Sequence, residues 1–306
     1  MHRTLGLGLA ALAGALVGVS ASGQQVLLIP NTGTGFDNVW GFNPFDGSLV
    51  DNNIIAADGI MQQVTKIVDT GSALFMVDES ADAVYRYGTN GVFQATIADN
   101  STSGIDQPFS IAVSNNQLYV SVVQGLNPNS VQRFDLDGSN QITWANVPGN
   151  PRDILFRAND VLVGDSTSDD IHSYTLAGSL AGTFHNSDGA TGIDFPNQMV
   201  EQAGGNVLAA GFTAPNGIYE YDASGNQINF WALNTSPRGV FRLGNGNILW
   251  AGGTRVGVLD PATGISVDVV NISGGSFRFI SPSSIPAPGA GLLLAGAGLA
   301  GLRRKR

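Results

Sequence analysis

Three arginines occupy similar places in the chain and could bind an anion together. Arg152, Arg238 and Arg278 each stand just after the start of a short run rich in β-branched and aromatic residues. A guanidinium group offers paired N–H donors that match a carboxylate or a phosphate. If the three runs lie side by side, the sequence predicts an anion-binding site. The alternative is a structural role, in which the arginines pair with Asp153, Asp194 or backbone carbonyls.

Oxygen-bearing side chains near the starts of similar runs indicate a second kind of chemistry. A divalent cation is held by carboxylate and amide oxygens that converge from several parts of the chain. The candidates for such a site are Asp106, Asn150, Asp153, Asp194 and Asn197. The alternative role of these residues is to cap turns. The loop 165–170 contains three Asp and leaves a surface Ca²⁺ ion as an alternative, although we expect no cofactor.

The remaining catalytic groups are scarce. The chain has no Cys, which excludes thiol nucleophiles, thiolate metal ligands and disulfides. Away from the two chain ends, only His172 and His185 could serve as a histidine base, and both lie in or beside runs predicted to be outer strands. There is no Gly-rich phosphate loop and no G-x-S-x-G motif. The sequence therefore predicts no catalytic residue.

The elements that must position these side chains belong to an internal repeat. A β-branched residue, two variable residues, an aromatic residue or Leu, and a turn ending in Gly recur six times, as in VYRYGTNG from Val84 and IYEYDASG from Ile218. The aromatic or Leu positions are Phe42, Tyr87, Phe134, Tyr174, Tyr221 and Leu259, spaced by 45, 47, 40, 47 and 38 residues. A period in the forties is typical of one four-stranded blade of a β-propeller.

Each repeat contains four predicted strands. Around Pro108 they are QPFSIAV, LYVSVV, SVQRFDL and QITWAN, separated by Asn, Asp and Gly turns. The first repeat lacks its opening strand, whereas the run 276–280 stands on period at the far end. We predict an all-β, six-bladed propeller of four-stranded antiparallel blades, in which 276–280 pairs with 26–29 and closes the ring. The predicted binding residues then lie at the rim of the central channel: Arg152, Asp153, Asn197, Arg238 and Arg278.

Two segments carry a resemblance to known propellers. The pattern Val-Asp-x-x-x-x-x-Val-x-x-Tyr in LFMVDESADAVYRYGTNGVF, from Leu74, resembles an NHL repeat, and VLVGDSTSDDIHSYTLAG from Val161 is similar to it. The chain thus resembles the NHL and streptogramin-lyase/gluconolactonase-like group of six-bladed propellers. The resemblance implies a blade but no single activity. For a lactonase it implies a channel metal, and for a lyase a basic His near the ring centre. No Glu occurs in 26–29 or 276–280, where the lactonases resemble one another in carrying one.

The two chain ends predict export and sorting. Residues 1–23 combine a basic start, an apolar run and small residues, the pattern of a signal peptide. Residues 283–306 combine a Pro motif, an apolar stretch predicted to be a helix, and a basic end: Pro286, Ala287 and Pro288, then Arg303, Arg304, Lys305 and Arg306. This tail resembles the PEP-CTERM sorting signal, with Ala in place of Glu.

The resemblance of the tail implies a Gram-negative bacterium. It also implies transient anchoring in the inner membrane and processing by an exosortase-type protease. The alternatives are an N-terminal segment retained as an anchor and a simple C-terminal tail anchor.

The segment 24–282 between these ends, predicted to be the propeller, is strongly acidic. It carries all 24 Asp and Glu but only nine of the 14 Lys and Arg, a net charge of −15. Nucleic acid and anionic membrane surfaces require positive patches, so both are disfavoured as partners. We predict an exported, envelope- or matrix-associated propeller that binds an extracellular polysaccharide or protein and is not an enzyme. The alternative is a secreted hydrolase or lyase with a metal site in the channel.

Overall fold

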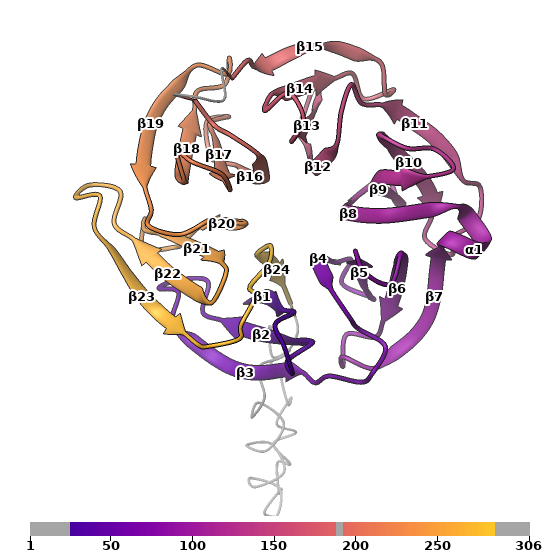
Figure 1. Cartoon of the computed structure of the whole chain (residues 1–306), viewed down its shortest axis with the longest axis horizontal. Coiled ribbons are helices and arrows are strands. Elements are labelled where there is room, and N and C mark those ends of the chain that lie inside the picture. Colours follow the sequence, from indigo (N-terminus) through magenta and orange to yellow (C-terminus); the bar gives the residue numbers. More distant parts are fainter. Residues whose placement is uncertain (1–24, 188–191, 285–306) are drawn as a thin grey trace, which may run out of the picture.

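The chain folds into six four-stranded antiparallel sheets arranged as blades around a central axis (Figure 1). The computed structural model describes residues 25–187 and 192–284. The predicted six-bladed, all-β propeller is confirmed. The apolar helices predicted near the two chain ends fall outside the described residues. Within the described part of the chain, no helix has the length and hydropathy to cross a membrane.

The blades follow one another around the ring, and each begins with an inner strand next to the channel. Blade 1 contains β24 (Ser281–Ser283), β1 (Val26–Asn31), β2 (Asn38–Phe42) and β3 (Leu49–Ile55). Blade 2 contains β4 (Val64–Asp69), β5 (Leu74–Asp78), β6 (Ala83–Tyr87) and β7 (Phe93–Asp99). Blade 3 contains β8 (Ile105–Ser114), β9 (Gln117–Gly125), β10 (Ser130–Asp135) and β11 (Ile142–Asn146), and helix α1 (Asn100–Ser103) precedes it.

The other three blades repeat this order without an additional helix among the described residues. Blade 4 contains β12 (Pro151–Phe156), β13 (Val161–Asp165), β14 (Ile171–Tyr174) and β15 (Leu180–His185). Blade 5 contains β16 (Pro196–Glu201), β17 (Val207–Gly211), β18 (Gly217–Tyr221) and β19 (Gln227–Ala232). Blade 6 contains β20 (Gly239–Arg242), β21 (Ile248–Gly252), β22 (Arg255–Leu259) and β23 (Ser266–Asn271).

The hydrophobic core is divided into six layers, each between two adjacent blades. Second strands such as β5 and β13 are buried at every position, because another blade packs on each of their faces. The six repeat positions lie at or next to the ends of the third strands. They are at most 1% exposed, and each belongs to a different layer: Phe42, Tyr87, Phe134, Tyr174, Tyr221 and Leu259. The repeat in the sequence therefore marks the side chains that join the blades.

Blade 1 is built from both ends of the described chain, but its closing strand differs from the prediction. The paired strand is β24, with Ser283 opposite Val26 and Ser281 opposite Leu28, and not 276–280. The segment 276–280 continues along the same edge with irregular contacts, among them a single bridge between Phe277 and Asn31. Between these two stretches the register shifts by one residue. The regular pairing with β1 therefore begins at Ser281, later than the alternating apolar residues of 276–280 suggest.

The same one-residue bulge recurs near the start of the inner strands. The register shifts between Val64 and Lys66, Pro108 and Ile111, Pro151 and Ile154, and Pro196 and Met199. A bulge places an additional residue opposite one partner residue and changes the direction of the side chains there. Neighbouring residues such as Arg152 and Asp153 can therefore both reach the channel instead of pointing to opposite faces of the blade.

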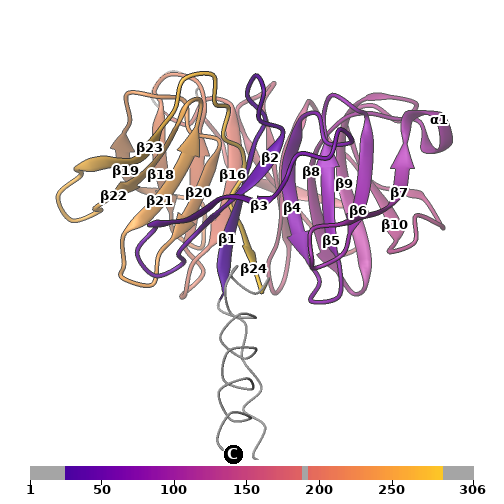
Figure 2. The same cartoon turned by 90° about the horizontal axis from the view of Figure 1, so that it is seen from below.

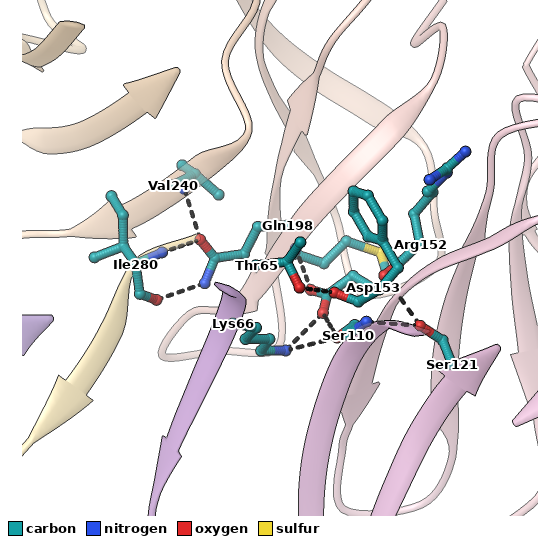
Figure 3. Close-up of polar contacts among 11 residues, drawn as sticks. Thr65, Lys66, Ser110, Ser121, Arg152, Asp153, Gln198, Val240 and Ile280 are labelled. Carbon is teal, nitrogen blue, oxygen red and sulfur yellow. Dashed lines mark hydrogen bonds and ion pairs between the residues drawn. The ribbon is translucent and has the colours of Figure 1, made fainter. Parts of the chain in front are cut away.

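A layer of polar side chains crosses the channel at these bulges (Figure 3). Asp153 is fully buried and contacts three other blades. Its Oδ1 lies 2.6 Å from Lys66 Nζ of blade 2 and accepts a hydrogen bond from Ser110 Oγ of blade 3 at 2.6 Å. Its Oδ2 accepts a hydrogen bond from the backbone N–H of Met199 in blade 5 at 2.8 Å.

Gln198 of blade 5 extends this layer to the last two blades. Its Oε1 accepts hydrogen bonds from the backbone N–H groups of Val240 at 3.0 Å and Ile280 at 2.8 Å, and its Nε2 donates to the Ile280 carbonyl at 2.6 Å. Gly239 stands beside Gln198 in the ring, where a Cβ would come within 2.7 Å of the Arg278 carbonyl, so the closing segment can approach only a glycine there. The layer links all six blades. It separates two pockets, one at each mouth of the channel.

We expect removal of 276–284 to abolish the single cooperative unfolding transition. In a chain of residues 25–275, the backbone groups of Val26–Leu28 that face β24 and the Gly253 carbonyl would lose their partners, and the core between blades 6 and 1 would be exposed. Differential scanning calorimetry of this chain beside one of residues 25–284 measures the effect. An unchanged transition in the shorter chain would show that the ring does not depend on its closing segment.

We expect Asp153→Asn to lower the free energy of unfolding by about 3–5 kcal/mol, because it leaves the Lys66 ammonium, whose side chain is only 12% exposed, without its carboxylate. Asp268→Asn is the matched control, since Asp268 lies 3.7 Å from Arg255 and both side chains are about one-third exposed. The control should lose less than about 1 kcal/mol. Urea denaturation measures both values, and equal losses would contradict a structural role for the layer.

Candidate functional site

One mouth of the channel, where the inner strands begin, forms a pocket of about 270 Å³. Its lining comes from blades 1 to 6 and combines cationic, aromatic and amide side chains. The lining residues are Gln63, Glu79, Phe109, Arg152, Phe195, Asn197, Phe212, Arg238 and Arg278. Asp153 and Gln198 do not line this pocket; Asp153 and Ser110 are completely buried beneath it. The pocket is therefore blind.

Bulges in the inner strands direct Arg152 and Asn197 into the pocket. Arg152 and Asn197 follow Pro151 and Pro196, the first residues of β12 and β16. Each is followed by a residue of the polar layer, so that one side chain of each pair faces the mouth and the next crosses the channel. Figure 3 shows Arg152 and Asp153 pointing away from one another in this way.

Aromatic rings hold two of the three arginines. The Arg152 guanidinium lies between Phe109 and Phe195, 4.5 Å from the centroid of each ring. Its Nε donates a 2.8 Å hydrogen bond to Ser166 Oγ. Arg238 lies over Phe212, also at 4.5 Å. Stacking on an aromatic face restrains a guanidinium group and leaves N–H donors at its edge available.

Arg278 is held by polar contacts. Its Nε donates to Thr32 Oγ1 at 2.9 Å, and its Nη1 lies 3.8 Å from Glu79 Oε2. Only 7% of Arg278 is exposed. Among the described residues, neither Arg152 nor Arg238 has a carboxylate within ion-pairing distance. The pocket thus combines three guanidinium groups with the single carboxylate of Glu79.

The surroundings disfavour this concentration of positive charge. Burial lowers the pKa of Arg152 and of Arg278, against a smaller opposing effect of Glu79. Burial, followed by repulsion from Arg278, lowers the pKa of Arg238 to about 10. All three groups still carry a proton at neutral pH, so the pocket stays cationic in a chain whose net charge is −10. An anion in the pocket would relieve both the burial cost and the repulsion.

Asn197 adds an unsatisfied amide to the same wall. Only 1% of the residue is exposed, and neither its Nδ2 nor its Oδ1 has a hydrogen-bond partner in the described structure. A buried amide without partners costs about 1–3 kcal/mol. This side chain is therefore available to a ligand as both a donor and an acceptor.

The structure brings four of the five predicted rim residues together in the pocket. Arg152, Asn197, Arg238 and Arg278 line it, whereas Asp153 lies in the polar layer beneath and pairs with Lys66. The ion pair considered between an arginine and Asp153 is replaced by this Lys66 contact. The residues 286–288 and 303–306 of the predicted sorting motif lie outside the described residues.

The side chains considered as metal ligands do not converge. Asp106 shares a hydrogen bond with Asp82, and burial followed by the repulsion of Asp82 raises the pKa of Asp106. Asp194 shares a hydrogen bond with Asp169, whose pKa is raised mainly by burial. Across residues 25–187 and 192–284, no group of three or more His, Asp or Glu is placed to hold a metal ion.

The loop 165–170 and the two histidines serve local structure. Asp169 and Asp170 accept hydrogen bonds from the backbone N–H groups of Phe195 and Ser187, each at 3.0 Å. His172 in β14 lies 3.4 Å from Asp165, and His185 ends β15 and contacts the Gly225 carbonyl at 3.0 Å. Neither histidine lines the pocket that contains Arg152, Arg238 and Arg278, which we call the Arg pocket.

Sequence reasoning missed the aromatic and acidic members of the pocket. Phe109 follows Pro108 as Arg152 follows Pro151, so an alignment of inner-strand starts could have identified it. Glu79, Phe212 and Ser166 each come directly after a second strand. They contact Arg278, Arg238 and Arg152, respectively. Phe195 had no such signal, because a phenylalanine before a strand is usually taken as part of the core.

Comparison with known proteins shows the fold and no family. No protein-family model and no curated protein matches the sequence. A chain of the nidogen/laminin complex is similar, with a TM-score of 0.67 and 13% identity over 84% of this chain and 98% of that chain. Virginiamycin B lyase from Staphylococcus aureus, solved with quinupristin, gives a TM-score of 0.55 and 14% identity over 82% and 86%.

A third solved structure is also similar. A protein proposed to be a gluconolactonase gives a TM-score of 0.56 and 13% identity over 79% of this chain and 80% of that chain. Identities this low establish the fold alone. The chain is therefore a six-bladed β-propeller that shares its fold with binding proteins and with enzymes.

Proposed function

We propose that this chain is an exported, envelope- or matrix-associated propeller that is not an enzyme and binds an anionic group of an extracellular polysaccharide or protein. The observation that carries the proposal is the blind pocket in which Arg152, Arg238 and Arg278 face one carboxylate. One buried and two partly buried guanidinium groups without sufficient counter-charge lower stability. Their presence in one pocket is explained if a ligand supplies the negative charge.

The position of the chain ends supports a role at a surface. Val26 and Ser283 pair at the mouth of the channel opposite the Arg pocket, so the described chain enters and leaves the ring on that side (Figure 2). The sequences at 1–23 and 283–306 support export and transient inner-membrane anchoring, with an exosortase-type enzyme as processing partner. A propeller held through its C-terminal tail would direct the Arg pocket away from the membrane.

We expect Arg238→Leu to reduce binding of anionic polymers at least tenfold without lowering stability. Polygalacturonate, a sulfated polysaccharide and polyphosphate are passed over the immobilised full chain, with neutral dextran for comparison, and binding is followed by surface plasmon resonance. Arg238 has a pKa below its unfolded value, so its charged form destabilises the fold at neutral pH. The free energy of unfolding of the unliganded variant should therefore be unchanged or higher.

The matched control is Arg255→Leu, because Arg255 lies on β22 near Asp268 and lines no part of the Arg pocket. This variant should bind anionic polymers as the parent chain does. Equal losses of polymer binding in the two variants would indicate non-specific charge attraction and contradict binding in the Arg pocket. Failure of every anionic polymer to bind would overturn the proposed function.

We expect the mature surface protein to lack the residues after about Pro288. A Pro-containing segment disfavours a regular strand or helix and is accessible to a protease, and an apolar stretch of 290–302 is shorter than the roughly 20 residues of a stable membrane span. Mass spectrometry of protein recovered from the native envelope tests this. Peptides covering 290–302 in the surface-exposed form would instead establish a permanent tail anchor.

A further inference from the structure

The uncharged side chains of the Arg pocket also restrict the ligands that it can bind. Asn197 borders the pocket with both amide atoms unpaired, and it is 99% buried. Its Nδ2 requires an acceptor and its Oδ1 requires a donor. A simple carboxylate satisfies only the first requirement. A ligand that pairs both atoms must carry a hydroxyl or an N–H group close to its negative charge.

Glu79 limits the charge that the ligand can carry. Its carboxylate lines the same pocket, 3.8 Å from Arg278. Like charges repel strongly where water is partly excluded. A phosphate dianion would bring further negative charge close to Glu79, whereas a hydroxyl group could donate a hydrogen bond to it. Glu79 therefore favours a ligand that places hydroxyl donors, and not further negative charge, beside its carboxylate.

The volume and the floor of the pocket limit the size of the ligand. Small-molecule pockets commonly enclose about 300–1,000 Å³, and the Arg pocket, at about 270 Å³, is slightly smaller than this range. The layer of Asp153 and Gln198 closes the channel beneath it, so that a polymer cannot pass through. A polymer can place only its terminal residue in such a pocket.

From these features we propose that the Arg pocket binds a single uronic acid residue at the end of an acidic polysaccharide. Its carboxylate contacts the guanidinium groups of Arg238 and Arg278, and its hydroxyl groups contact Asn197 and Glu79. The rings of Phe109, Phe195 and Phe212 supply apolar wall for the C–H groups of the sugar ring. This inference rests on the proposed function and specifies the ligand of the same pocket.

The test is a set of titrations of the full chain with sodium D-glucuronate, D-glucose, sodium acetate and inorganic phosphate by calorimetry. D-glucuronate should bind at least tenfold more tightly than acetate or phosphate, and D-glucose should not bind. Phosphate or acetate binding as tightly as D-glucuronate would overturn the uronate assignment and leave an anion pocket. Absence of binding by every anion would overturn the proposed function as well.

Two variants separate recognition of the hydroxyl groups from recognition of charge. Asn197→Leu should weaken D-glucuronate about tenfold, the loss expected for one or two hydrogen bonds, and leave acetate unchanged. Glu79→Gln keeps an acceptor but removes the negative charge, so phosphate should bind more tightly and D-glucuronate should change little. If Asn197→Leu does not fold, Glu79→Gln still decides: no gain in phosphate affinity would contradict the assigned role of Glu79.

Competition with polymers tests recognition of the terminal residue. Polygalacturonate shortened by acid hydrolysis has more ends per unit mass than the intact polymer. It should displace D-glucuronate more effectively at equal mass, in proportion to the number of ends. Equal displacement by intact and shortened polymer would show recognition along the chain and overturn this part of the proposal.

Discussion

A carboxylate at the axis of a ring must find partners in several blades at once, because a buried charge without partners is severely destabilising. Asp153 meets this requirement through Lys66, Ser110 and the backbone of Met199, which belong to three other blades. Gln198 joins the two that remain. The inter-blade core joins only neighbours, whereas this layer connects blades across the axis. It fixes their relative positions and provides the floor on which the Arg pocket is built.

The pocket follows from a local irregularity repeated around the ring. Regular strands would place residues such as Arg152 and Asp153 on opposite faces of a blade, where both would enter the hydrophobic layers. In blades 2 to 5 a bulge near the start of the inner strand directs such neighbouring residues toward the channel. The first residue of each such pair, as in Arg152 and Asn197, lines the pocket. The second, as in Asp153 and Gln198, belongs to the polar layer that forms its floor. A cationic pocket can thus exist in an acidic chain, because Arg152 and Arg238 are stacked on phenylalanine rings and Arg278 is held by Thr32 and Glu79.

The architecture could be predicted from the sequence because the joining residues are periodic. Tyr87 and Tyr174 recur at the same place in their repeats, and that place is an inter-blade layer. The register of closure could not be predicted, since Phe277 and Phe279 alternate as in a regular strand and nothing in their types reveals a bulge. The contact of Lys66 with Asp153 spans 87 residues and has no local signal. Equivalent positions did identify Arg152, Arg238 and Arg278, whereas Phe109 has a residue type typical of the core.

The closing contact between Leu28 and Ser281 also determines when the ring can form. Strand β1 is among the first strands to be made and its inner partner is the last, so blade 1 stays open until nearly the whole chain is available. Contacts between residues so far apart in sequence form slowly, because a long loop must be closed first. Until the ring closes, the edge of β1 is open to pairing with other chains. Because β24 has only three residues, the edge that stays open for it is short.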